Sequence, residues 1–294
     1  MRLLTDALKE GKVLVSDGAW GTMLQGRGLE PGDCPELWNV THRDDVFAIA
    51  RAYVDAGADM VLTNSFGGSP IKLSHYNLQD RAAELNEAAA RISREAAGAA
   101  HFVLGSIGPT GEILMMAQVT QESVYDDFRL QAEALKRGGV DAIVVETMSA
   151  IDEAVLAIRA AKESTGLEVV CTFTFDRSPN GEYRTMMGVS PEEMVRAVKG
   201  AGASIIGANC GNGFDQMVEV VKEIRRADPA TPILVHANAG LPVLKDGRTI
   251  YLETPADIIP KVRELADCGA NIIGGCCGTT PEHIRVIAEE LKRY

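Results

Sequence analysis

Cysteine is the residue type in this sequence with the clearest potential for chemistry. Cys210, Cys276 and Cys277 each stand beside glycine, in Asn209-Cys210-Gly211 and in Gly275-Cys276-Cys277-Gly278. Thiolates are preferred ligands of zinc, and a catalytic zinc site typically has three protein ligands and one exchangeable position. Glycine neighbours would let the backbone approach such a site closely. We therefore expect Cys210, Cys276 and Cys277 to bind catalytic Zn2+ if the fold brings them together.

The cysteine pattern also allows a second interpretation. Adjacent Cys276 and Cys277 could instead form the redox-active pair of a sensor without catalysis, and the reduced protein would then bind no zinc. The other cysteines, Cys34, Cys171 and Cys268, show no ligand spacing and are expected to be non-functional. The positions of the cysteines in the fold must separate these interpretations.

The elements that would position the cysteines alternate regularly along the chain. Eight short apolar runs are predicted as strands, at residues 13–16, 60–63, 102–106, 142–146, 169–174, 204–208, 233–237 and 271–275. Amphipathic segments follow them, at 46–56, 81–97, 124–137, 151–164, 192–199, 215–226, 256–266 and 282–292. A similar glycine-containing sequence precedes every second strand, at 56–59, 138–141, 201–204 and 268–271. This regularity predicts an α/β fold, a single (β/α)8 TIM barrel over residues 1–294.

The open doubly wound sheet is the structural alternative, but no Gly-x-Gly-x-x-Gly follows the first strand. In a barrel, residues just beyond the strands' C-terminal ends share one face, which carries the active site. Those residues are Asp17, Asn64, Ser106 with Gly108, Glu146, Thr174, Asn209 with Cys210, Asn238, and Cys276 with Cys277. Zinc is therefore expected at the C-terminal face of the strands.

Composition limits the partners. The chain has 294 residues and 46% hydrophobic content, and its 41 acidic residues outnumber 29 basic ones to give a net charge of -12. A nucleic-acid partner is not expected from this balance. No apolar run is long enough to cross a membrane and no secretory core is evident, so we expect a cytoplasmic protein. No lysine stands at a predicted strand end, which argues against a Schiff-base lyase.

Several segments carry a specific resemblance. They are Asp17-Gly18-Ala19-Trp20-Gly21-Thr22-Met23-Leu24, Thr63-Asn64-Ser65-Phe66, Gly105-Ser106-Ile107-Gly108-Pro109, Glu146-Thr147, Ala208-Asn209-Cys210-Gly211, Asn238-Ala239-Gly240-Leu241-Pro242 and Gly274-Gly275-Cys276-Cys277-Gly278-Thr279-Thr280-Pro281. Over nearly its whole length the sequence resembles the homocysteine S-methyltransferase family, which includes betaine enzymes, S-methylmethionine enzymes and the homocysteine module of cobalamin-dependent methionine synthase. The resemblance implies a (β/α)8 barrel with three-cysteine zinc. Residues 28–39 look like the bacterial stand-alone branch labelled betaine–homocysteine methyltransferase.

The resemblance also implies roles for individual residues. Asp17 and Glu146 would bind the ammonium of homocysteine, and backbone N–H groups of Gly18 and Ala19 would receive its carboxylate. Asn238 would be the fourth zinc ligand until the substrate sulfur replaces it. Asn209, at the end of its strand, is also predicted to contact substrate.

The expected reaction is zinc-dependent methyl transfer to the thiolate of L-homocysteine, giving methionine. The resemblance implies betaine or a related onium compound as the donor, and the aromatic faces of Trp20 and Trp38 are candidates to bind its quaternary ammonium group. Phe66 and Tyr76 are further aromatic candidates, and no histidine is expected to act. The alternative donor is a methylated corrinoid protein that docks on the barrel mouth.

Overall fold

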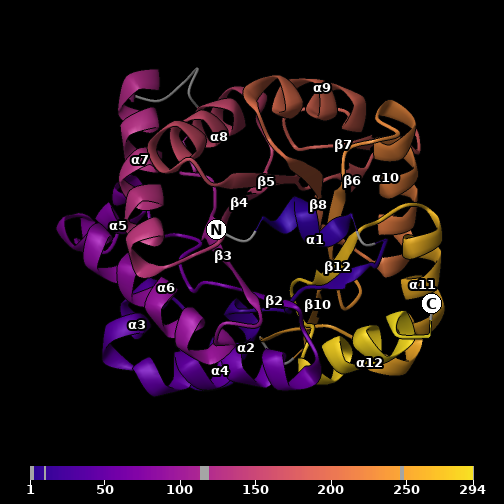
Figure 1. Cartoon of the computed structure of the whole chain (residues 1–294), viewed down its shortest axis with the longest axis horizontal. Coiled ribbons are helices and arrows are strands. Elements are labelled where there is room, and N and C mark those ends of the chain that lie inside the picture. Colours follow the sequence, from indigo (N-terminus) through magenta and orange to yellow (C-terminus); the bar gives the residue numbers. More distant parts are fainter. Residues whose placement is uncertain (1–2, 10, 113–118, 246–247, 294) are drawn as a thin grey trace.

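Eight parallel strands form the centre of the protein in a computed structural model that describes residues 3–9, 11–112, 119–245 and 248–293. In chain order they are β1 (Leu14–Val15), β2 (Met60–Leu62), β3 (Phe102–Ile107), β4 (Ala142–Met148), β5 (Glu168–Phe173), β8 (Ile205–Gly213), β9 (Ile233–Asn238) and β12 (Ile272–Gly275). They pair in the order β1-β12-β9-β8-β5-β4-β3-β2 and enclose a nearly closed barrel (Figure 1). The predicted TIM barrel and its eight strands are confirmed.

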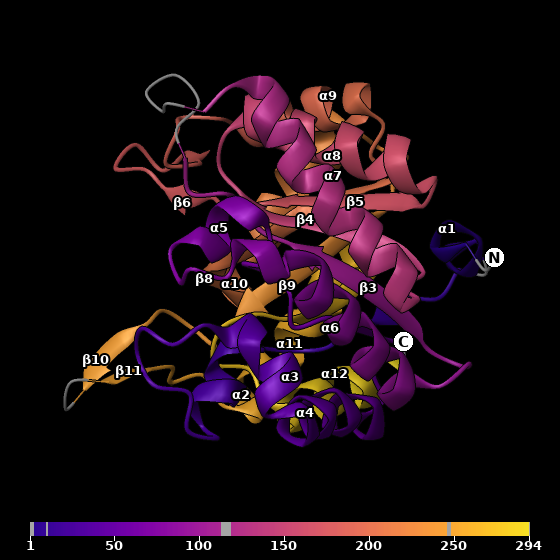
Figure 2. The same cartoon turned by 90° about the vertical axis from the view of Figure 1, so that its left-hand side faces the viewer.

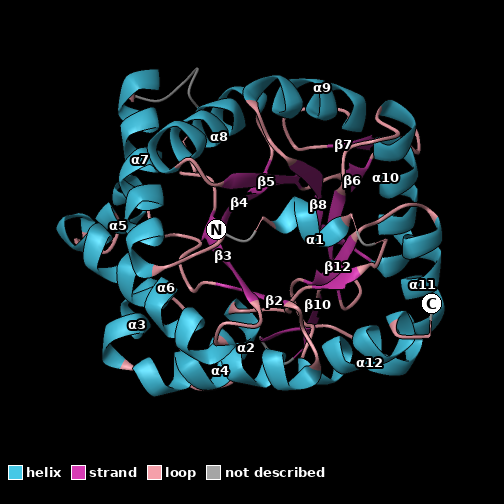
Figure 3. Cartoon of the chain, viewed as in Figure 1, coloured by secondary structure: helices cyan, strands magenta, loops and turns pink. Residues whose placement is uncertain are grey.

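A ring of helices surrounds the strands, as Figure 3 shows. The helices that follow the successive barrel strands are α4 (Arg43–Ala56), α6 (Ala82–Ala97), α7 (Gln121–Gly138), α8 (Ile151–Thr165), α9 (Pro191–Ala201), α10 (Phe214–Ala227), α11 (Pro255–Asp267) and α12 (Pro281–Leu291). Each overlaps a predicted amphipathic segment. In the described part of the chain, no helix combines the length and the hydropathy needed to span a bilayer.

The repeated sequence before every second strand joins neighbouring strands at the amino-terminal edge of the barrel. Asp59 Oδ2 accepts from Val15 N–H at 2.8 Å, which bridges β1 and β2 where the barrel closes. Asp141 Oδ2 likewise accepts from Val103 N–H at 2.8 Å, and Asn271 Oδ1 from Ile233 N–H at 2.9 Å. Three of the four repeats therefore supply a side-chain acceptor to a backbone N–H at the start of the preceding barrel strand.

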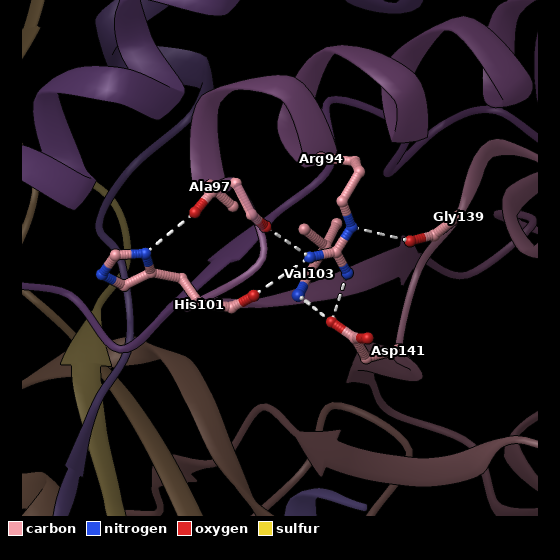
Figure 4. Close-up of polar contacts among 7 residues, drawn as sticks. Arg94, Ala97, His101, Val103, Gly139 and Asp141 are labelled. Atoms are coloured by element: carbon pink, nitrogen blue, oxygen red, sulfur yellow. Dashed lines mark hydrogen bonds and ion pairs between the residues drawn. The ribbon is translucent and has the colours of Figure 1, made fainter. Parts of the chain in front are cut away.

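Figure 4 shows this edge at β3 and β4. Arg94 of α6 pairs with Asp141 and also donates to the backbone oxygens of Gly139 at 3.1 Å and His101 at 3.0 Å. One guanidinium thus connects a helix to the ends of two strands. The ring of His101 donates from Nδ1 to Ala97 O at 2.9 Å.

Alternation along the strands separates the barrel interior from the helix-facing side. Leu62, Leu104, Val144, Leu234 and Ile272 belong to the interior cluster, together with Leu4 of α1 (Leu4–Leu8). Helix α1 lies across one end of the barrel in Figure 1. Residues two positions further along each strand therefore point into the opposite, carboxyl-terminal half of the barrel.

Short elements that the sequence did not predict extend the loops. They are α2 (Gly21–Gln25), the 3-10 turn η1 (Pro35–Leu37), α3 (Trp38–Thr41), α5 (Pro70–Ser74), the turn η2 (Gln79–Arg81), and the hairpins β6 (Asp176–Arg177) with β7 (Tyr183–Arg184) and β10 (Val243–Lys245) with β11 (Arg248–Ile250). Figure 2 shows β6 and the β10–β11 hairpin on the side of the barrel opposite α1. The loops at the carboxyl ends of the strands thus build the mouth of the barrel.

Candidate metal centre and substrate cavity

The fold brings the three predicted thiols together. Cys210 lies within β8, while Cys276 and Cys277 directly follow β12. All three sulfur atoms lie within 4.8 Å of one another, and Cys210 Sγ is 4.0 Å from Cys277 Sγ. Two sulfurs that bind one tetrahedral zinc at about 2.3 Å lie roughly 3.8 Å apart. The donor set and its spacing therefore fit a zinc ion.

The three clustered thiols differ in pKa. The thiols of Cys210 and Cys276 donate to Cys277, and the Tyr251 hydroxyl also donates to it, which together lower the pKa of Cys277 to about 3. The same pairing and complete burial raise the pKa of Cys276. One thiolate is thus favoured even in a buried position. Cys34, Cys171 and Cys268 belong to no potential metal-binding group in the described residues.

Thr147 and Cys210 both have a left-handed backbone conformation. The φ angles are 62° at Thr147 and 59° at Cys210, values that a β-branched residue such as threonine rarely adopts. Asn209 Oδ1 accepts from Thr147 N–H at 2.8 Å and from Thr172 Oγ1 at 2.7 Å, and Asn209 Nδ2 donates to Thr147 Oγ1 at 2.7 Å. The fully buried Asn209 side chain therefore holds the strained backbone of Thr147 in β4. Asn209 is not among the lining residues of the cavity described below, and its contact with substrate stays a prediction.

The two predicted carboxylates lie at the ends of β1 and β4. Asp17 Oδ2 accepts from Trp20 Nε1 at 2.9 Å and from Leu62 N–H at 2.8 Å, while Ser106 Oγ donates to Glu146 Oε1. Burial raises the pKa of Asp17 to about 7, and burial together with the charge of Asp17 raises that of Glu146 to about 7. In the described part of the chain neither forms an ion pair with lysine or arginine. A cation that entered between them would restore their ionised forms.

A cavity of about 280 Å³ extends from the thiols toward these carboxyl groups. Its walls include all three cysteines, Glu146, and the Gly18-Ala19-Trp20 segment, but not Asp17 itself. Ala19 N–H already donates to Thr279 Oγ1 at 3.1 Å, so a substrate carboxylate would compete with that hydroxyl. No lysine or arginine of the described chain is among the lining residues.

The two tryptophans proposed for donor binding are placed differently. Trp20 lines the cavity, as does Phe66. Trp38 is buried in α3 and stacks on His42 with ring centroids 4.1 Å apart, away from the cavity walls. Tyr76 is also absent from those walls. Among the described residues, Trp20 and Phe66 are therefore the phenyl and indole side chains that line the cavity.

Sequence reasoning missed three residues. Glu36 and His236 line the cavity, and Tyr251 contacts Cys277. His236 Nε2 and Asn238 Oδ1 are both buried without a hydrogen-bond partner in the described structure. For Asn238, an unpaired buried oxygen is consistent with a ligand position. His236 lies two residues before Asn238 in the same strand, and that spacing is the signal that could have found it.

The fold and site define a (β/α)8 barrel with a buried three-thiol centre at the mouth, an arrangement suited to metal-assisted chemistry on sulfur. The sequence profile described as Homocysteine S-methyltransferase matches residues 14–291. The chain belongs to the homocysteine S-methyltransferase family, whose reaction is methyl transfer to the sulfur of homocysteine.

Relatives support this assignment. The chain is 32% identical to "Methionine synthase" of Mycobacterium leprae over 96% of its own length, and 33% identical to "Methionine synthase" of Mycobacterium tuberculosis over 97%. It spans only 24% and 25% of those two proteins. The fold matches the metallated form of the homocysteine methyltransferase MmuM from Escherichia coli, with a TM-score of 0.80, 22% identity, and coverage of 97% of this chain and 99% of that one.

Proposed function

We propose that this chain transfers a methyl group from a small onium donor, glycine betaine or a related compound, to L-homocysteine, with Zn2+ held by Cys210, Cys276 and Cys277. The observation that carries the proposal is the convergence of three thiols on a cavity whose wall includes the buried carboxyl group of Glu146 and the Gly18-Ala19-Trp20 segment that follows Asp17. When bound, zinc would keep the substrate sulfur as a thiolate, the form that attacks a methyl carbon.

The residues of the chain would orient homocysteine by its charges. Asp17 Oδ1 has only a weak contact with Ser16 Oγ at 3.4 Å, so it can accept from the ammonium. Glu146 would accept a second N–H, while its hydrogen bond from Ser106 fixes the carboxylate. Asn238 Oδ1 would occupy the fourth metal position in the resting state and yield it to the substrate sulfur, because a neutral amide binds zinc less strongly than a thiolate.

The charge of the cavity favours a cationic donor. Glu36, Glu146 and the sulfur cluster line it together with the aromatic rings of Trp20 and Phe66, and no described lysine or arginine does. Aromatic faces and carboxylates both attract an onium group. After transfer the donor becomes neutral at nitrogen or sulfur, so the same attraction no longer holds the product.

A methylated corrinoid protein remains the second candidate donor. Exposed apolar side chains stand on the loops of the barrel mouth, at Phe66, Met186, Met187, Leu241, Leu244 and Leu252. Apolar residues gathered on one face are typical of protein-binding surfaces. The corrinoid candidate requires such a surface, whereas a small onium donor does not.

A donor panel separates these proposals. Zinc-loaded protein and homocysteine are incubated with glycine betaine, S-methylmethionine, dimethylsulfoniopropionate or methylcobalamin, and methionine is measured by mass spectrometry. We expect methionine from at least one onium donor and none from the Cys277→Ser variant. Methionine from methylcobalamin alone would replace the onium proposal by the corrinoid one.

A further inference from the structure

The imidazole of His236 lies in the wall of the substrate cavity without a partner. His236 is 2% exposed, and no donor or acceptor of the described residues is within hydrogen-bonding distance of Nε2. Leu234 belongs to the barrel interior and Val235 to the helix-facing core, so strand alternation directs His236 inward. An unpaired polar group in a buried position is costly unless a ligand or water completes it.

A glycine on the next strand makes room for the ring beside Asp17. Gly274 of β12 is the register partner of His236. A Cβ atom at Gly274 would lie 2.9 Å from His236 Cδ2 and 2.7 Å from Asp17 O. The ring edge and the Asp17 backbone therefore meet at the same small residue. Glu146 also lines the cavity.

The ammonium group of an amino acid has three N–H donors. Asp17 and Glu146 provide carboxylates for two of them. A third carboxylate would add a further like charge to an already acidic cavity, whereas a neutral imidazole adds an acceptor without charge.

We propose that His236 is a substrate-binding residue that accepts the third N–H of the homocysteine ammonium and so selects α-amino thiols over simple thiols. This inference rests on the proposed placement of the ammonium between Asp17 and Glu146. It assigns a binding role to a histidine that lies inside a strand and has no ligand spacing with other histidines.

The test compares two ligands on the zinc-loaded protein by calorimetry. L-Homocysteine carries the ammonium, and 4-mercaptobutanoate is the same thiol acid without it. His236→Leu removes the acceptor at similar volume, and His236→Met serves the same purpose if the first variant does not fold. We expect about tenfold or greater loss of homocysteine affinity, the range for a hydrogen bond to a charged group. Binding of 4-mercaptobutanoate and zinc content should stay unchanged.

Two further variants give a positive control. The amide of His236→Asn lies near the position of Nδ1 and that of His236→Gln near Nε2, so one of them should recover part of the selectivity. Equal weakening of both ligands, or unchanged homocysteine affinity, would overturn the inference.

Asp17→Asn and Glu146→Gln are measured alongside. If they also leave the homocysteine to 4-mercaptobutanoate ratio unchanged, the proposed ammonium site itself fails. If they reduce that ratio and the His236 variants do not, only the inference about His236 fails.

Discussion

Cys210, Cys276 and Cys277 are distinguished from the other three cysteines by their position in the fold. Their location after predicted strands was enough to place them on one face, because parallel strands in a barrel end together. His236 and Tyr251 could not be found this way. His236 lies within a strand, and Tyr251 reaches Cys277 from a loop after β11 that no local pattern predicts.

Single Cys→Ser substitutions test the metal ligands. Replacing Cys210, Cys276 or Cys277 should reduce bound zinc from about one ion per chain to nearly none, because two thiolates and an amide no longer form the three-thiolate site. Metal content is measured by mass spectrometry after dialysis. Cys268→Ser is the matched control, since Cys268 lies outside the cluster, and it should retain zinc and activity. Full activity in any of the three ligand variants would contradict the assignment.

The buried carboxyl groups should make ligand-free stability depend on pH. The pKa of Glu146 is raised to about 7, so the folded state binds its proton more tightly than the unfolded state does. Stability from this group is therefore present at low pH and is lost as pH rises from the unfolded value through about 7. Glu146→Gln should raise the melting temperature at pH 8 by at least about 2 °C and have little effect at pH 5.

The same substitution should weaken homocysteine binding at pH 8, since the amide loses the charge that faces the ammonium. Thermal unfolding and calorimetry on one preparation provide both readouts. A variant that is less stable at pH 8, or one that binds homocysteine normally, would refute the role given to Glu146.

At the scale of elements, apolar periodicity predicted the barrel strands and surrounding helices, and the internal repeat predicted closure. The repeat's aspartates and asparagine were not recognised as acceptors for strand N–H groups, because that role needs the register of the neighbouring strand. The left-handed conformation of Thr147 was also not predictable. Tertiary hydrogen bonds to Asn209 hold it against the local preference of threonine.

The close approach of β8 to β9 leads to a prediction about the stability of the barrel. A Cβ at Gly207 would lie 1.8 Å from Leu234 O, so Gly207→Ala must displace the strand that precedes Cys210. We expect a loss of more than about 2 kcal/mol in unfolding free energy and reduced zinc retention. Gly200→Ala is the control, because a Cβ there meets nothing within 4 Å and alanine favours the helix. Denaturant unfolding of both variants provides the measurement. Equal unfolding free energies for the two variants would show that the contact between Gly207 and Leu234 does not constrain the barrel.

For the whole molecule, the sequence was sufficient for the fold and the family but not for the donor. The core strands and the cluster of three thiols follow from periodicity and position, whereas donor choice would depend on the loops of the mouth. There the structure separated Trp20, which lines the cavity, from Trp38, which is buried beside His42. The electrostatic character of the cavity, acidic and without a described lysine or arginine, emerged only when distant segments were assembled.

The central claim is that homocysteine sulfur becomes the fourth ligand of a zinc ion held by three cysteines. X-ray absorption at the zinc edge tests this most directly on the zinc-loaded protein with and without homocysteine. The resting spectrum should fit three sulfurs and one oxygen, and homocysteine should change it to four sulfurs, because thiolate displaces the weaker amide oxygen. A resting spectrum that already fits four sulfurs, or one that homocysteine leaves unchanged, would contradict the claim.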